Sequence, residues 1–374
     1  MSAPYIQASV QPENSKASYG EYDNVDFVAT FENRKLVLNS VRLEGDIRVT
    51  QSGVNLTGEL VYMDPNIGIH SVVDTVQTSM QTKGSVENLS GYARLVGMTE
   101  DATTSNLDMM NSENTSELKM PMKELMPLVL QGQKNGIAGS VLNDANSFSF
   151  KPQFVLNTAS EVNNGGITMS YNKSGAIRVT FTLARNANVL YGSVDANTSY
   201  SLSNLRLVYV TVPEDNIKNE TSHKVKYHIK QSVLSSRTNV SSKVPAVVSG
   251  VSCSFIEQSK ENAFFDNTNE REVFPQLEEL NFLFNNNTNE YISYTINDRE
   301  EVLARYIESV KDTKHSNMEL NALKGGSSFG IGLYFGGELI NLANQTFNVV
   351  LNSGANISTS PYSLHLYFHS QIVV

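Results

Sequence analysis

The chain has 374 residues, a formal net charge of -10 and a pI near 5.2, and this length favours two packed units over one. A surface that binds nucleic acid needs clustered Lys and Arg to neutralise phosphates, so the acidic balance argues against direct contact with a genome. The single cysteine, Cys253, excludes an internal disulfide framework and a Cys-rich zinc site, and the absence of tryptophan disfavours a site that stacks sugar rings.

The first segment, residues 1–24, is polar and carries one base, Lys16, against three acidic residues. It is therefore not a basic genome-binding arm. The opening residues lack the basic and apolar regions of a signal peptide, and no apolar run is long enough to cross a bilayer. We expect the product to stay in the cytosol that made it.

Alternation of apolar and polar residues is the main pattern after Val25, and it predicts antiparallel strands with one face in a core and the other in water. The clearest segments are Val41–Val49, Ile177–Leu183, Val225–Ile229 and Tyr362–Phe368. Further strands are predicted at Val25–Phe31, Leu56–Met63, Ser71–Ser79, Ser147–Leu156, Leu205–Val212, Val247–Phe255, Tyr291–Ile296 and Phe347–Leu351. The chain is therefore predicted to be all-β, with Ser363, His365 and Tyr367 on the outward face of the last strand.

Helical periodicity is scarce. Residues Arg299–Lys311 predict one helix, because their apolar residues share a face and Asp298 can cap its start. Residues 120–127 can hold only a turn or two, since Pro127 disfavours helical geometry in the residue before it.

The two halves of the chain look like weak copies of each other. Each half ends in a strand that opens with Tyr-Ser-Leu, at Tyr200 and at Tyr362. Between them, residues 212–222 have the polar composition of a linker. We therefore predict an N-terminal arm at residues 1–24, a first domain at residues 25–213 and a second domain at residues 214–374.

The histidines do not form a recognisable metal motif. His365 and His369 are four residues apart, a spacing that chelates on a helix. In a strand that spacing is about 13 Å, at roughly 3.3 Å per residue, which is too far for one ion. We interpret both as polar residues at a strand surface or in a loop contact.

Other patterns fall short of the chemistry that they suggest. The acidic stretch Asp266–Glu272 lacks the Gly and the bidentate Glu of an EF-hand, so we interpret it as a solvated acidic loop, with a loosely held surface calcium ion as the alternative. The glycines from Gly325 to Gly337 do not form a phosphate loop, and no Gly-x-Ser-x-Gly motif is present. Glu278 and Glu279 point to different faces, and Cys253 has no identifiable partner. We expect no catalytic residue and no cofactor.

The order of these features carries a family resemblance. A polar arm is followed by a first half that closes in Asn204–Tyr209 and a second half, with a helix-bearing loop, that closes in Pro361–Ser370. From about Val25 onward the chain resembles the double jelly-roll major capsid proteins of tailless icosahedral, membrane-containing viruses. That lineage includes adenovirus and related bacterial, archaeal and large eukaryotic DNA viruses.

The resemblance implies a fold and a set of partners. It implies two consecutive eight-stranded antiparallel jelly rolls with short loop helices, and homotrimers that form pseudo-hexagonal capsomers of a virion shell. Implied partners are neighbouring capsomers, penton and minor capsid proteins and an internal viral membrane, with no direct nucleic acid and with assembly in the host cytoplasm. The candidate assembly contacts are Tyr5, Ile6 and Val10 in the arm. Two alternatives stay open: a jelly-roll carbohydrate- or receptor-binding module, such as a spike or adhesin, and a double jelly-roll hydrolase.

Overall fold

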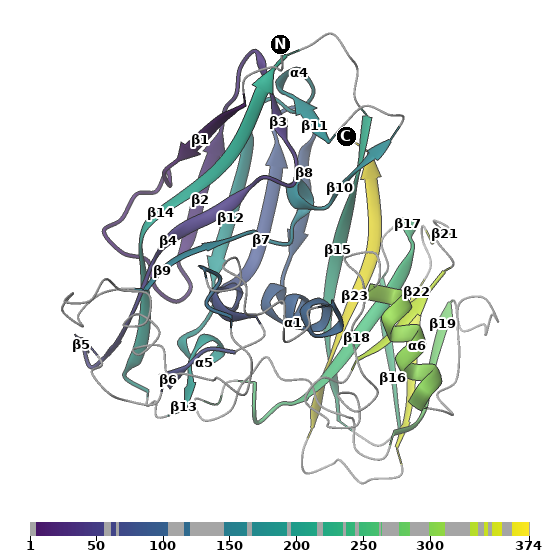
Figure 1. The fold of residues 1–374 in the computed structure, drawn as a ribbon. Helices are drawn as coiled ribbons and strands as arrows, with labels where there is room; N and C mark the ends of the chain where they lie inside the picture. The colour runs from purple at the N-terminus through teal and green to yellow at the C-terminus, as the bar shows by residue number, and fades with distance from the viewer. Residues whose placement is uncertain are drawn as a thin grey trace.

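The chain folds mainly into antiparallel β-sheets, which confirms the predicted all-β class (Figure 1). The computed structural model describes residues 5–55, 61–64, 67–103, 116–119, 146–162, 167–192, 196–214, 220–234, 237–243, 247–261, 263, 277–284, 299–310, 330–335, 340–342, 346–353 and 361–373. None of the helices in these ranges is both long enough and apolar enough to span a bilayer.

Two sheets share one core in the first half. Sheet 1 has the order β11-β3-β14-β4-β5, with β1 also paired to β14 and β9 to β4. Its strands are β1 (Ile6–Val10), β3 (Arg34–Val37), β4 (Arg42–Gln51), β5 (Val54–Asn55), β9 (Asn146–Phe150), β11 (Thr168–Ser170) and β14 (Thr198–Pro213). Sheet 2 has the order β2-β12-β7-β8. Its strands are β2 (Asn24–Ala29), β7 (Val73–Met80), β8 (Gly84–Leu89) and β12 (Ile177–Leu183).

The alternation predicted for β12 is confirmed. Its apolar residues, Ile177 to Leu183 in steps of two, are at most 1% exposed, whereas Arg178 is exposed. Phe181 meets Phe27 of the neighbouring strand edge to face, with ring centroids 6.2 Å apart. Between the sheets, the Tyr209 hydroxyl in β14 donates to the Thr30 carbonyl just after β2, at 3.3 Å.

Two further sheets form the second half, and one of them also includes β10 from the first half. Sheet 3 has the order β10-β15-β23-β18-β20, and sheet 4 has the order β16-β22-β19. The strands of sheet 3 are β10 (Ala159–Val162), β15 (Glu220–Val233), β18 (Gly250–Glu257), β20 (Ile331–Tyr334) and β23 (Tyr362–Val373). The strands of sheet 4 are β16 (Arg237–Lys243), β19 (Leu277–Phe284) and β22 (Thr346–Ser353). Phe347 of sheet 4 packs edge to face on Phe368 of sheet 3, at 5.2 Å between centroids.

The remaining elements of the described residues are short strand pairs and helices. The pairs are β6 (Val61–Tyr62) with β13 (Tyr191–Gly192), and β17 (Val247–Val248) with β21 (Ile340–Asn341). The helices are η1 (Gly68–Val72), α1 (Tyr92–Thr103), η4 (Val155–Asn157), α4 (Tyr171–Ser174), α5 (Asn186–Val189) and α6 (Arg299–Val310). The second half of the predicted strand at Ser147–Leu156 is therefore not a strand, since β9 ends at Phe150.

The central strand of sheet 3, β23, is buried on both faces over most of its length, and this corrects one prediction. Ser363, His365 and Tyr367 were expected to face water, but they are 0%, 6% and 0% exposed. The long strands β15 and β23 lie between the first-half sheets and sheet 4, so the face opposite the apolar core packs against the first half (Figure 1). Because the first half covers this polar face, its residues do not face solvent.

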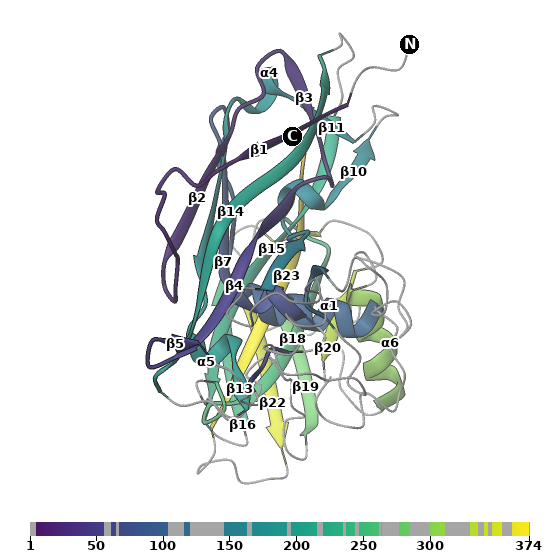
Figure 2. The same ribbon diagram turned by 60° about the vertical axis from the view of Figure 1, so that its left-hand side comes forward.

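The predicted helix at Arg299–Lys311 is confirmed as α6. It packs on β20, where a Cβ at Gly330 would collide with the Tyr306 ring and one at Gly332 with Ser309. The Tyr306 hydroxyl donates to the Met98 carbonyl in α1 at 2.8 Å. Helices α1 and α6 therefore meet beside the sheets and join the two halves (Figure 2).

Part of the N-terminal arm is integrated into the first half. Strand β1 pairs antiparallel with β14, from Ile6 opposite Thr211 to Val10 opposite Leu207. Tyr19 is 2% exposed and forms an isolated bridge with Leu202. The single chain therefore already provides backbone partners for β1 and for Tyr19.

Several predicted features lie outside the described residues. They are the short helix at 120–127, the strand at Tyr291–Ile296, the acidic stretch Asp266–Glu272, the start of the strand at Leu56–Met63 and most of the glycines from Gly325 to Gly337.

Candidate functional site: a histidine cluster between the two halves

Two of the three candidate assembly residues, Ile6 and Val10, lie in the edge strand β1, and Tyr5 directly precedes it. Tyr5 is 71% and Ile6 47% exposed, while Val10 is half-buried against the first core. The structure thus places Tyr5 and Ile6 where another molecule can reach them, and their role as contacts stays a prediction.

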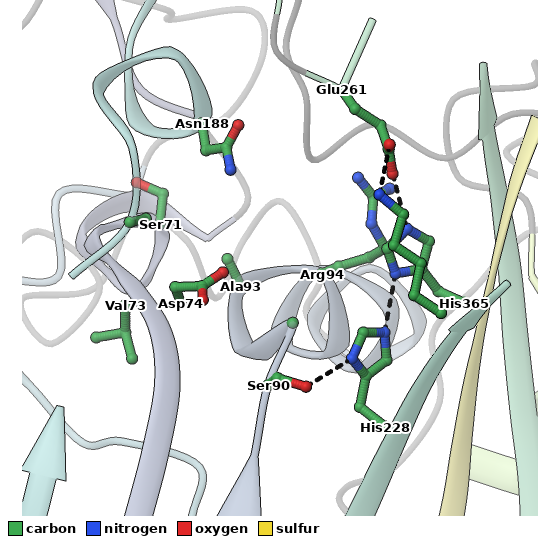
Figure 3. A pocket seen from close by; sticks show the side chains of 13 residues that line it. Ser71, Val73, Asp74, Ser90, Ala93, Arg94, Asn188, His228, Glu261 and His365 are labelled. Atoms are coloured by element: carbon green, nitrogen blue, oxygen red, sulfur yellow. Dashed lines mark hydrogen bonds and ion pairs between the residues drawn. The ribbon is translucent and has the colours of Figure 1, made fainter. Parts of the chain in front are cut away.

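A chain of hydrogen bonds links four side chains from distant parts of the sequence (Figure 3). Ser90, between β8 and α1, lies 2.9 Å through Oγ from Nδ1 of His228 in β15. Nε2 of His228 lies 2.9 Å from Nδ1 of His365 in β23. Nε2 of His365 lies 3.1 Å from Oε1 of Glu261, which follows β18. The first half supplies the serine and the second half the other three groups.

The two imidazoles lie edge to edge. Their planes differ by 14° and their centroids are 5.1 Å apart, which fits an in-line N–H···N contact. The Tyr367 ring stacks on His228 at 4.7 Å between centroids. The absence of a side chain at Gly91 allows the His228 ring to lie against the turn before α1, since a Cβ there would lie 2.7 Å from Cε1 of His228.

Burial keeps both histidines neutral. Desolvation, with the charges of His365 and Arg94, lowers the pKa of His228 to about 3. Desolvation and Arg94 lower that of His365 to about 4, although Glu261 opposes them. Burial alone would raise the pKa of Glu261, but hydrogen bonds from His365 and Lys230 hold it at about 2, so this carboxylate is ionised at neutral pH.

A second histidine contact lies further along β23. The Lys226 ammonium, 2.7 Å away, can only donate to Nδ1 of His369, so Nε2 of His369 donates to Ser252 Oγ at 2.8 Å. Desolvation and Lys226 keep the pKa of His369 well below its usual value. The interpretation of His365 and His369 as strand-surface residues is therefore wrong, because both are buried at 6% and 3% exposure.

A cavity of about 370 Å³ opens beside the cluster. Its walls come from both halves and include Ser90, Arg94, Asn188, His228, Lys230 and Glu261 (Figure 3). Cationic, anionic and neutral polar groups therefore face one space. Within the described ranges, no group of three or more His, Cys, Asp or Glu is arranged to hold a metal ion.

Sequence reasoning singled out neither Ser90 nor Glu261. The serine precedes an unremarkable Gly-Tyr pair, and Glu261 follows a strand among polar residues. Cys253, in contrast, is fully buried, and burial raises the pKa of its thiol.

Two sandwiches formed by consecutive halves of one chain define the double jelly roll of viral major capsid proteins. No protein-family model and no curated protein matches this chain. Among solved structures, the Faustovirus major capsid protein is 8% identical with a TM-score of 0.67, over 100% of this chain and 90% of that chain. The fold predicted from the sequence is thereby confirmed.

Two further solved structures share this fold. The mavirus major capsid protein is 10% identical with a TM-score of 0.53, over 98% of this chain and 88% of that one. A chain of the Sputnik virophage is 11% identical with a TM-score of 0.55, over 99% and 86%. At these identities the similarity establishes the fold.

Proposed function

We propose that this chain is the major capsid protein of an icosahedral virus and works as a structural tile of the virion shell. The observation that carries the proposal is the match to the Faustovirus major capsid protein over 100% of this chain. That match extends over both sandwiches. A shell tile needs contacts with its own copies and no catalytic step.

The two-sandwich organisation supports a trimeric capsomer. We propose that the domains are residues 25–213 and 214–374, divided in the segment between β14 and β15. Three such chains present six similar sides, so a closed trimer can tile a hexagonal lattice. Obligate interfaces of this kind bury on the order of 2,000 Å² or more.

The edge strand β1 supports contacts between capsomers. Tyr5 and Ile6 expose apolar surface at the start of an edge strand, which favours association with another protein surface. We propose that Tyr5, Ile6 and Val10 contact neighbouring copies in the shell.

The charge balance bears on the other partners. A net charge of -10 is unfavourable for a surface that binds nucleic acid. We propose that the shell lies over an internal lipid membrane, that penton and minor capsid proteins complete it, and that assembly takes place in the host cytoplasm.

The test is the assembly state of the purified chain. Light scattering should return a homotrimer at micromolar concentration, and electron microscopy should show capsomers or shells. A stable, dispersed monomer would contradict the proposal. A monomer that bound glycans would instead favour the carbohydrate-binding alternative.

A further inference from the structure

The order of groups in the cluster is that of an activated serine. A hydroxyl, an imidazole base and a group that orients the base recur where a serine must become a nucleophile. Here Ser90 contacts His228, His365 contacts the far nitrogen of His228, and Glu261 ends the chain (Figure 3).

The Glu261 carboxylate determines which ring nitrogen of each histidine carries the proton. The ionised Glu261 only accepts, so Nε2 of His365 carries its proton and its Nδ1 accepts. Nε2 of His228 therefore donates to His365, and its Nδ1 is left to accept from the Ser90 hydroxyl. Because burial keeps His228 neutral, that acceptor is present at every pH above about 3.

The surroundings of Ser90 suit a nucleophile. Ser90 is half-buried, lines the 370 Å³ cavity, and lies two residues before the start of α1 (Tyr92–Thr103). The first N–H groups of a helix have no intrahelical partner and favour negative charge, as does the nearby Arg94 guanidinium. A cavity of this size is at the lower end for small-molecule sites.

We propose that Ser90 is a reactive serine that takes an acyl group from a small activated ester bound in this cavity. The Ser90 Oγ–carbon bond forms and the ester carbon–oxygen bond breaks. The hydroxyl proton passes to Nδ1 of His228 and then to the leaving oxygen, which departs as an alcohol. The product is one O-acylserine. His365 and Glu261 act as positioning residues, since His365 contacts the base and Glu261 contacts His365.

The reaction is stoichiometric. We expect one acylation event per chain, which is compatible with the structural role proposed above and independent of it.

The test uses p-nitrophenyl acetate on the purified full-length protein in its native assembly, with peptide mass mapping. We expect p-nitrophenolate release at one equivalent per chain and acetyl on Ser90. Ser90→Ala should abolish this labelling, and His228→Gln should slow it about 100-fold. Ser85→Ala is the matched control, because this exposed serine in β8 does not line the cavity.

The pH profile gives a second measurement on the unaltered protein. Acylation through a neutral His228 should have a constant rate from pH 5 to 8, whereas an unassisted hydroxyl should react about tenfold faster per pH unit. In Glu261→Gln the constant profile should give way to the rising one. Acetyl on other residues only, a rising profile in the unaltered protein, or equal Ser90 rates with His228→Gln would overturn the proposal.

Discussion

The Tyr367 hydroxyl donates a 2.8 Å hydrogen bond to the main-chain carbonyl of Gly91, 276 positions earlier in the chain. One residue is in the last strand of sheet 3, and the other is in the turn between β8 and α1. The same tyrosine ring stacks on His228. The second half of the chain therefore holds the turn that carries Ser90, and the cluster exists only when both halves are docked.

Removing this hydroxyl should weaken the docking. Tyr367→Phe keeps the ring but loses a buried hydrogen bond, although Leu95 N–H still reaches the Gly91 carbonyl at 3.2 Å. We expect the free energy of unfolding in urea to fall by about 1 kcal/mol. Tyr22→Phe is the control, since this side chain is 58% exposed and its change should stay within about 0.5 kcal/mol. Equal effects of the two changes would contradict the role of the bond.

The sequence predicted the strands better than the docking between them. Alternation in β12 identified the buried face, because one side of that strand faces the first core. The same rule failed for His365 and Tyr367, since an apolar and a polar layer can both be buried when a second sandwich covers the polar one. Local patterns also carry no signal for a site that unites Ser90 with Glu261, because only the sheet registers bring them together.

A buried acid should make stability depend on pH. Desolvation raises the pKa of Glu87 to about 8, although its carboxylate accepts from Val155 N–H at 3.1 Å and from the Thr78 hydroxyl. A raised folded pKa gives a contribution that is complete below about pH 4.5 and is lost as the pH rises through about 8. Glu87→Gln should therefore flatten the fall in unfolding free energy between pH 5 and 9, by a few kcal/mol in order of magnitude. The exposed Glu32→Gln should keep the original slope, and an unchanged slope in Glu87→Gln would show that this carboxyl is ionised in the fold.

The buried histidines should make the unfolding free energy depend on pH in the opposite direction. The lowered pKa of His365, about 4, gives stability that is present above pH 6.5 and is lost as the pH falls toward 4. The difference in unfolding free energy between the unaltered protein and His365→Gln should therefore shrink as the pH falls from 6.5 toward 4.5. Arg48→Gln, an exposed change without a titrating group, should give a constant difference. A constant difference for His365→Gln as well would contradict a neutral buried imidazole.

The exposed edge strand should matter for shells and not for folding. Tyr5→Ser with Ile6→Ser removes apolar surface that a single chain leaves exposed, so the unfolding free energy should change by less than about 0.5 kcal/mol. We expect trimers by light scattering but fewer shells by electron microscopy. The control is Val54→Ser in β5, whose side chain is 69% exposed. Unimpaired shell assembly in the double variant would remove β1 from the capsomer contacts.

Two glycines with similar positive φ values allow the cost of backbone strain to be distinguished from the cost of a side-chain collision. Gly84 and Gly91 have φ of +74° and +61°, so alanine at either position should cost about 1 kcal/mol in backbone strain. A Cβ at Gly84 meets nothing within 4 Å, whereas one at Gly91 would lie 2.7 Å from the His228 ring.

Gly91→Ala must therefore move His228 away from Ser90, and we expect at least about 1 kcal/mol of additional destabilisation in urea. The same displacement should slow acetylation of Ser90 by p-nitrophenyl acetate, while Gly84→Ala should label at the original rate. If both variants lost the same stability and labelled equally, the close approach of His228 to this turn would have no energetic or chemical consequence.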